Sequence, residues 1–129
     1  MPETRRQIQF ILSQNEMHWL DEPIPSQEQI DQVELSLNTR VKEWYRDFVR
    51  LGGLNDLRFS AEVFSPQELL ENQSHISSRD YVAFASNGCG DLFCWSAGES
   101  TGIFLWDHET NRFVQDAPDF LTWLERNRF

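Results

Sequence analysis

The stretch YVAFASNGCGDLFCW, which runs from Tyr81 to Trp95, decides the fold class. Residues 81–86 alternate in character and are rich in β-forming side chains, so they predict a strand, and residues 92–95 predict a second one. Between the two, Asn87-Gly88 is a strong signal for a two-residue hairpin turn, because both positions tolerate a positive φ. The stretch therefore predicts an antiparallel hairpin.

The polar core of this hairpin raises two chemical alternatives, a phosphate cradle and a metal knuckle. A phosphate cradle needs glycines that lead into a helix N-terminus, whereas the glycines here lead into a β-run with no nearby lysine. A zinc knuckle needs four thiolate or imidazole ligands, and the C-x4-C spacing is unusual for one. We therefore expect a turn without metal or cofactor, and a buried free thiol at Cys94. The groups considered as zinc ligands are Cys89, Cys94, His75 and His108.

Asp91 closes the turn and has two possible roles. Its carboxylate can accept backbone N–H bonds and tie the hairpin together, or it can project outward as an acid that binds a partner. We favour the structural role, which it would share with Asn87, Gly88 and Gly90, and we keep Asp91 among the candidate binding residues.

Two further strands follow the hairpin. Residues 102–108 and 112–115 suit strands, and short turn-like connections link them to what precedes. Four consecutive strands with tight links predict an antiparallel meander, and residues 57–64 predict a strand before it, although their alternation is imperfect. Residues 116–119 (DAPD) then start a closing helix, whose apolar residues recur at i, i+3 and i+4.

Helical periodicity dominates the N-terminal half. Ser26, with Gln29 three residues later, forms a capping-box pattern, and Gly52-Gly53 ends a later helix because glycine adopts the left-handed conformation at no steric cost. Helices and strands are segregated along the chain, which predicts one α+β domain over residues 1–129. In it, an antiparallel sheet packs with N-terminal helices and a closing C-terminal helix. The helices before the meander are predicted at residues 4–14, from residue 26 onward, at 41–51 and at 65–73.

The composition is that of an acidic chain of 129 residues, with a formal net charge of −10 and Lys42 as its single lysine. Apolar residues make up 40%, enough for one core without disulfides or metal. An acidic surface repels phosphate backbones, which argues against nucleic-acid binding, and attracts basic partners. The chain lacks an apolar run of about 18 residues and the pattern of a signal peptide, so we expect a cytoplasmic protein without a membrane span.

The acids gather in two stretches without Lys or Arg, one between Arg6 and Arg40 and one between Arg79 and Arg112. Two interpretations stay open, a surface that keeps the protein in solution and an acidic face that captures a basic partner. Trp19 lies in the first stretch and is either a core residue or an exposed anchor. The candidate partner-binding residues are Trp19, Asp21, Glu22, Asp91, Glu99, Asp107 and Glu109.

Catalytic signals are weak. Nucleophilic catalysis needs a nucleophile held beside a base, and His18, His75 and His108 are the only histidines. His108 stands between Asp107 and Glu109 in a predicted surface turn, where we expect it to titrate freely. The two carboxylates are close enough in sequence for general acid/base work, but a hairpin turn would leave them solvated. We therefore expect no catalytic residues.

Several segments, in order, resemble the SUKH superfamily (the Smi/Knr-like domain). YVAFASNGCGDLFCW, GIFLWDHET and DAPDFLTWL are similar to the C-terminal half of that family, which has a strand, a Gly-Asp turn, two more strands and a final helix. PSQEQIDQVELSLN and VKEWYRDFVRLGG resemble the opening helix and the following Gly-Gly segment of its N-terminal half. The resemblance covers about residues 24–127, which leaves residues 1–23 as an N-terminal helix and a Pro-rich connection.

This resemblance implies a binding module without known catalytic residues. Bacterial members look like immunity proteins that neutralise toxins, many of them nucleases or deaminases, and fungal members resemble regulators of cell-wall synthesis. For this chain we expect an immunity protein that covers a basic toxin domain. The alternative is a housekeeping scaffold or regulatory protein with an endogenous protein partner. The oligomeric state stays open.

Overall fold

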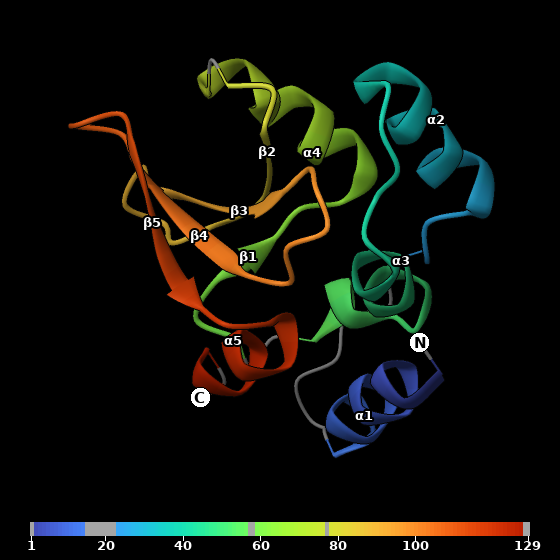
Figure 1. Ribbon diagram of the computed structural model, residues 1–129. Coiled ribbons are helices and arrows are strands. Elements are labelled where there is room, and N and C mark those ends of the chain that lie inside the picture. Colours follow the sequence, from blue (N-terminus) through green and yellow to red (C-terminus); the bar gives the residue numbers. More distant parts are fainter. Residues whose placement is uncertain (1, 15–22, 57–58, 77, 128–129) are drawn as a thin grey trace.

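The computed structural model describes residues 2–14, 23–56, 59–76 and 78–127. Within this part of the chain, five α-helices and five strands form one α+β arrangement (Figure 1). The helices are α1 (Pro2–Ser13), α2 (Gln27–Leu37), α3 (Glu43–Arg50), α4 (Pro66–Asn72) and α5 (Phe120–Arg126), with short 3₁₀ turns at Gly53–Asn55 and Gln73–His75. The strands are β1 (Glu62–Val63), β2 (Tyr81–Ser86), β3 (Leu92–Ser96), β4 (Ile103–Asp107) and β5 (Arg112–Ala117).

The strands form one antiparallel sheet in sequence order, β1-β2-β3-β4-β5. The predicted four-strand meander with a strand before it and a helix after it is therefore confirmed. Helices α1, α2 and α3 gather on one side of the sheet, while α4 and α5 lie on either side of it in the view of Figure 1. None of the helices in the described part of the chain combines the length and apolar character that a membrane-spanning helix needs.

The main core lies between the sheet and helices α3 and α5. Phe84 of β2 lies at a bulge, where the register with β3 shifts between Ala83 and Ala85. Its ring contacts those of four core residues. Aromatic pairs in such offset and edge-on arrangements stabilise a core beyond their buried area. The four partners are Trp44, Trp95, Phe120 and Trp123.

On the opposite face of the meander, side chains from β2 and β5 contact each other. Tyr81 of β2 stacks on Phe113 of β5, with ring centroids 4.0 Å apart and 8° between the planes, although two strands separate them in the sheet. The sheet must curl strongly for these side chains to meet. Cys94, in the middle of β3, faces this side and is fully buried as a free thiol, as predicted. Burial raises the pKa of this thiol to about 12, which keeps it protonated and unreactive.

The capping box predicted at Ser26 is confirmed, and the helix predicted at residues 65–73 also begins with a capping box. Ser26 caps α2 and Ser65 caps α4, each through a complete capping box in which the serine hydroxyl accepts the backbone N–H three residues on. The reciprocal side chains are Gln29 and Glu68. Such caps depend on residues within one helical turn, so they can be recognised without knowing the tertiary structure.

The predicted strand at residues 57–64 is confirmed in part: among the described residues of this range, Glu62–Val63 form strand β1 and pair with β2. Residues 57–58 lie outside the described part of the chain. Ser60 is held instead by the end of α5: its backbone N–H donates to the carbonyl of Asn127 at 2.6 Å, and its hydroxyl contacts the same residue. A tertiary contact therefore replaces the ladder that the sequence indicated.

The start of the closing helix is also corrected. Asp116 and Ala117 belong to β5, and α5 begins at Phe120, where the side chain of Asp119 accepts the backbone N–H of Thr122 at 2.8 Å. Pro118 explains the shift, because a residue before proline is pushed out of the helical region toward extended conformations. The strand therefore runs on to the proline.

Candidate functional site

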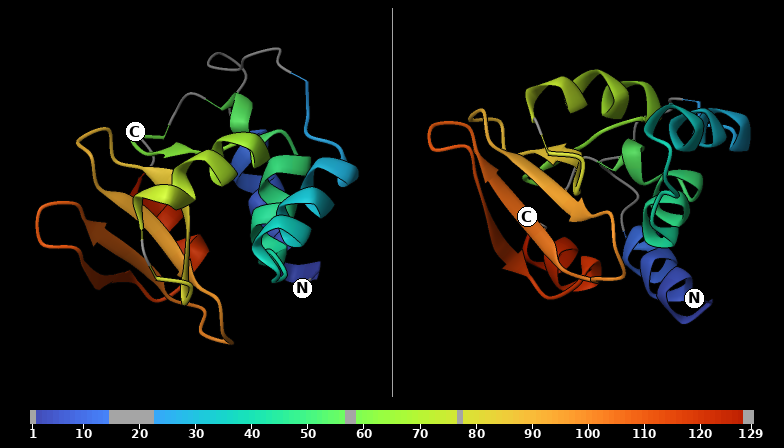
Figure 2. Two further views of the ribbon diagram at one scale, coloured as in Figure 1. Left: turned by 90° about the horizontal axis from the view of Figure 1, so that it is seen from above. Right: turned by 45° about the horizontal axis from the view of Figure 1, so that its top comes forward.

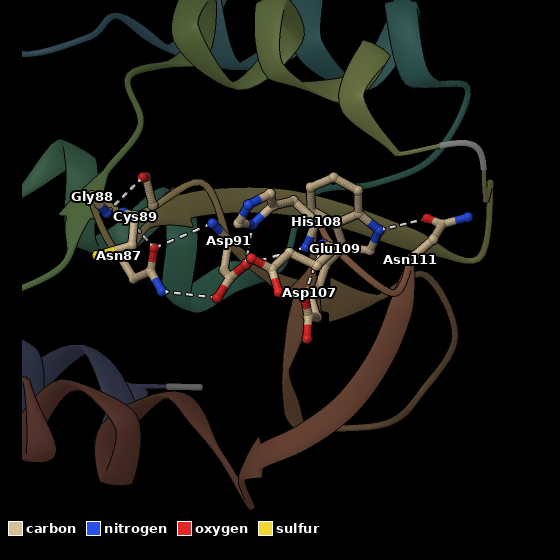
Figure 3. Close-up of polar contacts among 10 residues, drawn as sticks. Asn87, Gly88, Cys89, Asp91, Asp107, His108, Glu109 and Asn111 are labelled. Carbon is tan, nitrogen blue, oxygen red and sulfur yellow. Dashed lines mark hydrogen bonds and ion pairs between the residues drawn. The ribbon is translucent and has the colours of Figure 1, made fainter.

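Two turns of the meander lie together at one end of the sheet. In an antiparallel meander alternate turns share an end, so the β2–β3 turn (residues 87–91) lies beside the β4–β5 turn (residues 108–111). Figure 3 shows these two turns and the polar contacts between them. We call three carboxylates at this end of the sheet the acidic end: Asp91 and Glu109 of the two turns, and Asp107, the last residue of β4.

The β2–β3 turn is wider than the two-residue hairpin predicted from Asn87-Gly88. The backbone N–H of Asn87 donates to the carbonyl of Asp91 at 3.2 Å, which closes a loop of five residues. Asn87 does not adopt a positive φ; Gly88 (φ 81°) and Gly90 (φ 98°) do. The amide oxygen of Asn87 accepts the backbone N–H groups of Cys89 and Asp91, at 2.8 and 3.2 Å, so the side chain organises the loop from within.

Asp91 joins the two turns. One of its carboxylate oxygens, Oδ1, accepts the backbone N–H of His108 at 3.1 Å and lies 2.6 Å from Nδ1 of the His108 ring. The other oxygen accepts the side-chain amide of Asn87 at 3.3 Å. The carboxylate thus has the structural role that we favoured, but it ties together two neighbouring hairpins rather than one (Figure 3).

His108 does not titrate freely, contrary to the prediction. Its hydrogen bond to Asp91 raises the pKa of the imidazole above the ordinary value of 6.5, since the carboxylate favours the protonated ring. The same contact lowers the pKa of Asp91 below 3.8. Gly90 allows this approach, because a Cβ at that position would stand 3.0 Å from the imidazole ring.

The β4–β5 turn is held by its own residues. Oδ1 of Asp107 accepts the backbone N–H of Glu109 at 2.8 Å. The backbone carbonyl of Asp107 accepts the backbone N–H of Asn111, also at 2.8 Å. Asn111 adopts a left-handed conformation (φ 57°), and its side-chain oxygen accepts the indole N–H of Trp106 at 2.7 Å. The turn is therefore rigid, and Glu109 projects into solvent from it.

We expect Asp91→Asn to lower the pKa of His108 toward 6.5, because the substitution removes the carboxylate that stabilises the imidazolium. An NMR titration of the His108 ring measures the change. Glu109→Gln is the matched control, since Glu109 acts on His108 only through space and should shift its pKa less. An unchanged His108 pKa in Asp91→Asn would contradict the contact.

The same contact gives a pH window for stability. Because the pKa of His108 is raised on folding, its contribution is complete below pH 6.5 and is lost as the pH rises through the raised pKa. Because the pKa of Asp91 is lowered, its contribution is present above pH 3.8 and is lost as the pH falls through the lowered pKa. The pair therefore stabilises the two turns most between these limits, and Asp91→Asn should flatten this part of the stability profile.

Glu99 lies at the other end of the sheet, in the β3–β4 connection (residues 97–102), and not with the acidic end. Lys42 reaches this connection, where its ammonium group donates to the carbonyls of Gly98 (2.6 Å) and Ser100 (3.2 Å). Partial burial lowers the pKa of Lys42, and the charge of Glu99 opposes that shift. Trp19, Asp21 and Glu22 lie outside the described residues, so their role as partner-binding residues stays a prediction.

The acidic end has few groups that could bind a metal ion. Asp91, Asp107 and His108 offer ligand atoms within 4.8 Å of one another, but these side chains are exposed or half-exposed, and exposed acids gather in this way without an ion. The expected absence of a metal stays a prediction. A hollow of about 660 Å³ lies elsewhere, between the end of α2 and the start of β2, next to Thr39 and Tyr81.

Two side chains have structural roles that we did not predict from the sequence. The amide group of Gln73 donates to the carbonyl of Ala83 at 2.7 Å and accepts its N–H at 3.1 Å, so it occupies the edge of β2 beyond the short strand β1. Asn111 locks the turn that carries Glu109. An asparagine directly before a strand is a recognisable signal for a left-handed residue, whereas the contact of Gln73 depends on tertiary structure.

Comparison with known proteins identifies the family. The family model of the SMI1 / KNR4 family (SUKH-1) matches residues 24–126. A search of curated proteins found no match to the chain. The matched region contains every element from α2 to α5 and both turns of the acidic end. Because the match covers most of the chain, this protein belongs to the SMI1 / KNR4 family (SUKH-1), whose domains are generally non-catalytic protein-interaction modules.

Proposed function

We propose that this domain is an immunity protein that neutralises a bacterial toxin by covering a basic surface with its acidic end. The observation that carries the proposal is the pair of hydrogen-bonded turns that present Asp91, Asp107 and Glu109 at one end of the sheet. The family supplies the general role of protein binding, and the charge of the chain selects a basic partner.

The rigidity of the turns supports this role. Asn87 and Asp91 hold the first turn, Asp107 and Asn111 hold the second, and the Asp91–His108 contact joins them. Carboxylates on a rigid support lose little conformational freedom when a partner binds, so more of the electrostatic attraction appears as affinity. A flexible acidic loop would not have this advantage.

Electrostatics also suggests how the toxin would be blocked. With a net charge of −10, the protein attracts a basic surface over a distance and accelerates its capture. The groove with which a nuclease or deaminase binds nucleic acid is such a surface, because it must neutralise phosphates. Occupying that groove excludes the substrate sterically, and no covalent step is needed.

Co-expression tests the proposal directly. The protein should restore the growth of cells that produce the toxin encoded beside it, and the two proteins should co-elute in gel filtration. Failure to rescue growth together with failure to form a complex would remove the immunity role. A stable complex with a housekeeping protein instead would support the regulatory alternative.

Charge variants should locate the contact on the acidic end. We expect Asp107→Asn with Glu109→Gln to slow association with the toxin about tenfold at low salt, because steering depends on these charges. Asparagine keeps the oxygen that accepts the N–H of Glu109, so the turn should persist. Stopped-flow association rates at several salt concentrations provide the measurement.

The matched control removes two exposed charges from the opposite end. Asp80→Asn with Glu99→Gln changes the net charge equally, but both residues lie where β2 begins and β3 ends. This control should slow association far less than the variant at the acidic end. Equal effects of the two variants would show that only total charge matters, and would contradict a localised contact.

A further inference from the structure

The two edges of the sheet differ in how they are protected. The edge formed by β1 is only two residues long. Beyond it, the backbone of β2 is satisfied by the N–H of Phe64, which donates to the carbonyl of Phe84 at 2.8 Å, and by the amide of Gln73 on Ala83. Short strands and covering side chains are the usual means by which proteins prevent edge-to-edge pairing.

The other edge has less protection. β5 has six residues and pairs with β4 on one side, and in the described part of the chain no strand pairs with its other side (Figure 2). It contains no lysine and no proline, the residues that most often blunt an edge. Val114, in the middle of the exposed stretch, leaves 63% of its surface in solvent. An apolar residue there favours pairing with another strand.

The sequence of β5 identifies the partner strand. We propose that β5 is a dimerisation edge, on which β5 of a second copy of this chain pairs in antiparallel fashion with Val114 opposite Val114. In this register Arg112 of each copy stands opposite Asp116 of the other, and both residues are exposed. The edge is therefore complementary to itself in charge, as a two-fold symmetric interface requires.

Two features at the C-terminal end of β5 limit the number of its residues that can pair with a second copy. Arg126 of α5 donates to the carbonyl of Asp116 at 2.5 Å, and the register with β4 shifts between Ile103 and Phe104. The pairing is therefore confined to residues 112–116. Such an interface is smaller than the roughly 1,200–2,000 Å² of stable complexes, so the dimer forms reversibly and depends on concentration.

The dimer is compatible with partner binding and independent of it. Antiparallel pairing of the two β5 strands directs the acidic ends of the two copies away from each other, because each β5 begins beside its own acidic end. Each copy, with a net charge of −10, repels the other at low ionic strength. At about 0.15 M salt the screening length is about 8 Å, which weakens this repulsion more than it weakens contacts at the edge.

Cysteine cross-linking tests the register. The experiment uses the full chain with Cys89→Ser, since Cys89 is exposed and Cys94 is buried. Directly opposite residues in an antiparallel ladder have Cα atoms about 4.5–5.5 Å apart, within the reach of a disulfide. Val114→Cys should therefore form covalent dimers under mild oxidation. In the same register Gln115 stands opposite Phe113, so the Gln115→Cys control should not.

Charge reversal tests the same interface by sedimentation equilibrium at 0.15 M salt. Wild-type protein should shift from monomer toward dimer as its concentration rises. Arg112→Asp and Asp116→Arg change the net charge in opposite directions, yet each places like charges opposite each other and should abolish dimers. The double variant should restore them. Val114→Lys, at an exposed position, should also abolish dimers without affecting folding, which thermal unfolding checks.

The outcomes decide between this interface and the alternatives. Monomeric wild-type protein at every concentration would overturn the proposal, as would cross-linking of Gln115→Cys as efficient as that of Val114→Cys. Dimers that survive both single charge reversals would place the interface elsewhere. A double variant that folds but stays monomeric would refute the Arg112–Asp116 register. Rescue by the double variant together with cross-linking specific to position 114 would establish it.

Discussion

Phe84→Ala is expected to lower the free energy of unfolding by about 3–5 kcal/mol, the usual cost of removing a fully buried phenylalanine ring. Phe84 has no exposed surface, and its ring lies between the sheet and the helices. Alanine would leave a cavity that the neighbouring rings cannot fill, because they are themselves held by contacts with one another.

The contacts of Phe84 explain why the effect should be this large. Its ring centroid lies 5.0 Å from that of Trp44 in α3 and 5.1 Å from that of Trp123 in α5. It lies 5.8 Å from Trp95 in β3 and 6.4 Å from Phe120. One side chain thus connects two helices to the sheet, so its loss loosens both helix contacts together.

Phe10→Ala provides a matched control, because the same ring is removed from a site on α1 where the residue is 64% exposed. Its effect should stay within about 0.5 kcal/mol. Urea unfolding followed by tryptophan fluorescence measures both variants. Phe84→Leu keeps most of the side-chain volume, so its loss of unfolding free energy should lie between those of Phe84→Ala and Phe10→Ala. This variant should remain folded even if Phe84→Ala does not fold. Equal costs for Phe84→Ala and Phe10→Ala would contradict the central position of this ring.

The meander was predictable from sequence because its signals are local. Alternation in residues 81–86 and the turn-forming residues after them specify a hairpin within about a dozen residues. The capping box at Ser26 is local in the same way. The strand expected at residues 57–64 is shorter than predicted, because its alternation is imperfect and Ser60 has a hydrogen-bond partner at the far end of the chain, in Asn127. A local sequence pattern does not predict the structure where a residue distant in sequence offers a competing hydrogen bond.

The acidic end was predicted only in part. Asp91, Asp107 and Glu109 come together because alternate turns of a meander share an end, whereas Glu99 falls at the opposite end by the same rule. The contact between Asp91 and His108 depends on the register of β3 and β4 and on the glycine at position 90, which lets the ring approach. Geometry of this kind, at a few tenths of an ångström, is absent from residue patterns.

Gly53→Ala is the second large effect that we expect, a loss of about 1–3 kcal/mol in the free energy of unfolding. Gly52-Gly53 was predicted to end a helix through left-handed glycine, but only Gly52 has a positive φ (89°). Gly53 matters for a different reason. A Cβ at this position would stand 2.5 Å from ring atoms Cε2 and Cζ of Phe48, far inside van der Waals contact.

The ring of Phe48 has nowhere to move. It is 1% exposed and packs against Phe59 and Phe120, with centroids 5.9 and 5.6 Å away. Relief of the overlap therefore requires a shift of the backbone or of several rings, which is the origin of the cost of overpacking. The effect comes from crowding in the native state and not from the conformational freedom of glycine.

Gly98→Ala is the matched control, since its added Cβ would have only the hydroxyl of Ser96 nearby, at 3.9 Å, and its φ is not positive. Thermal unfolding should show almost no change for this variant. A double-mutant cycle then separates crowding from backbone effects: in Phe48→Leu, which shortens the side chain, Gly53→Ala should cost clearly less than in the wild type. An equal cost in both backgrounds would mean that Gly53 is needed for its backbone, and that the contact with Phe48 is not the cause.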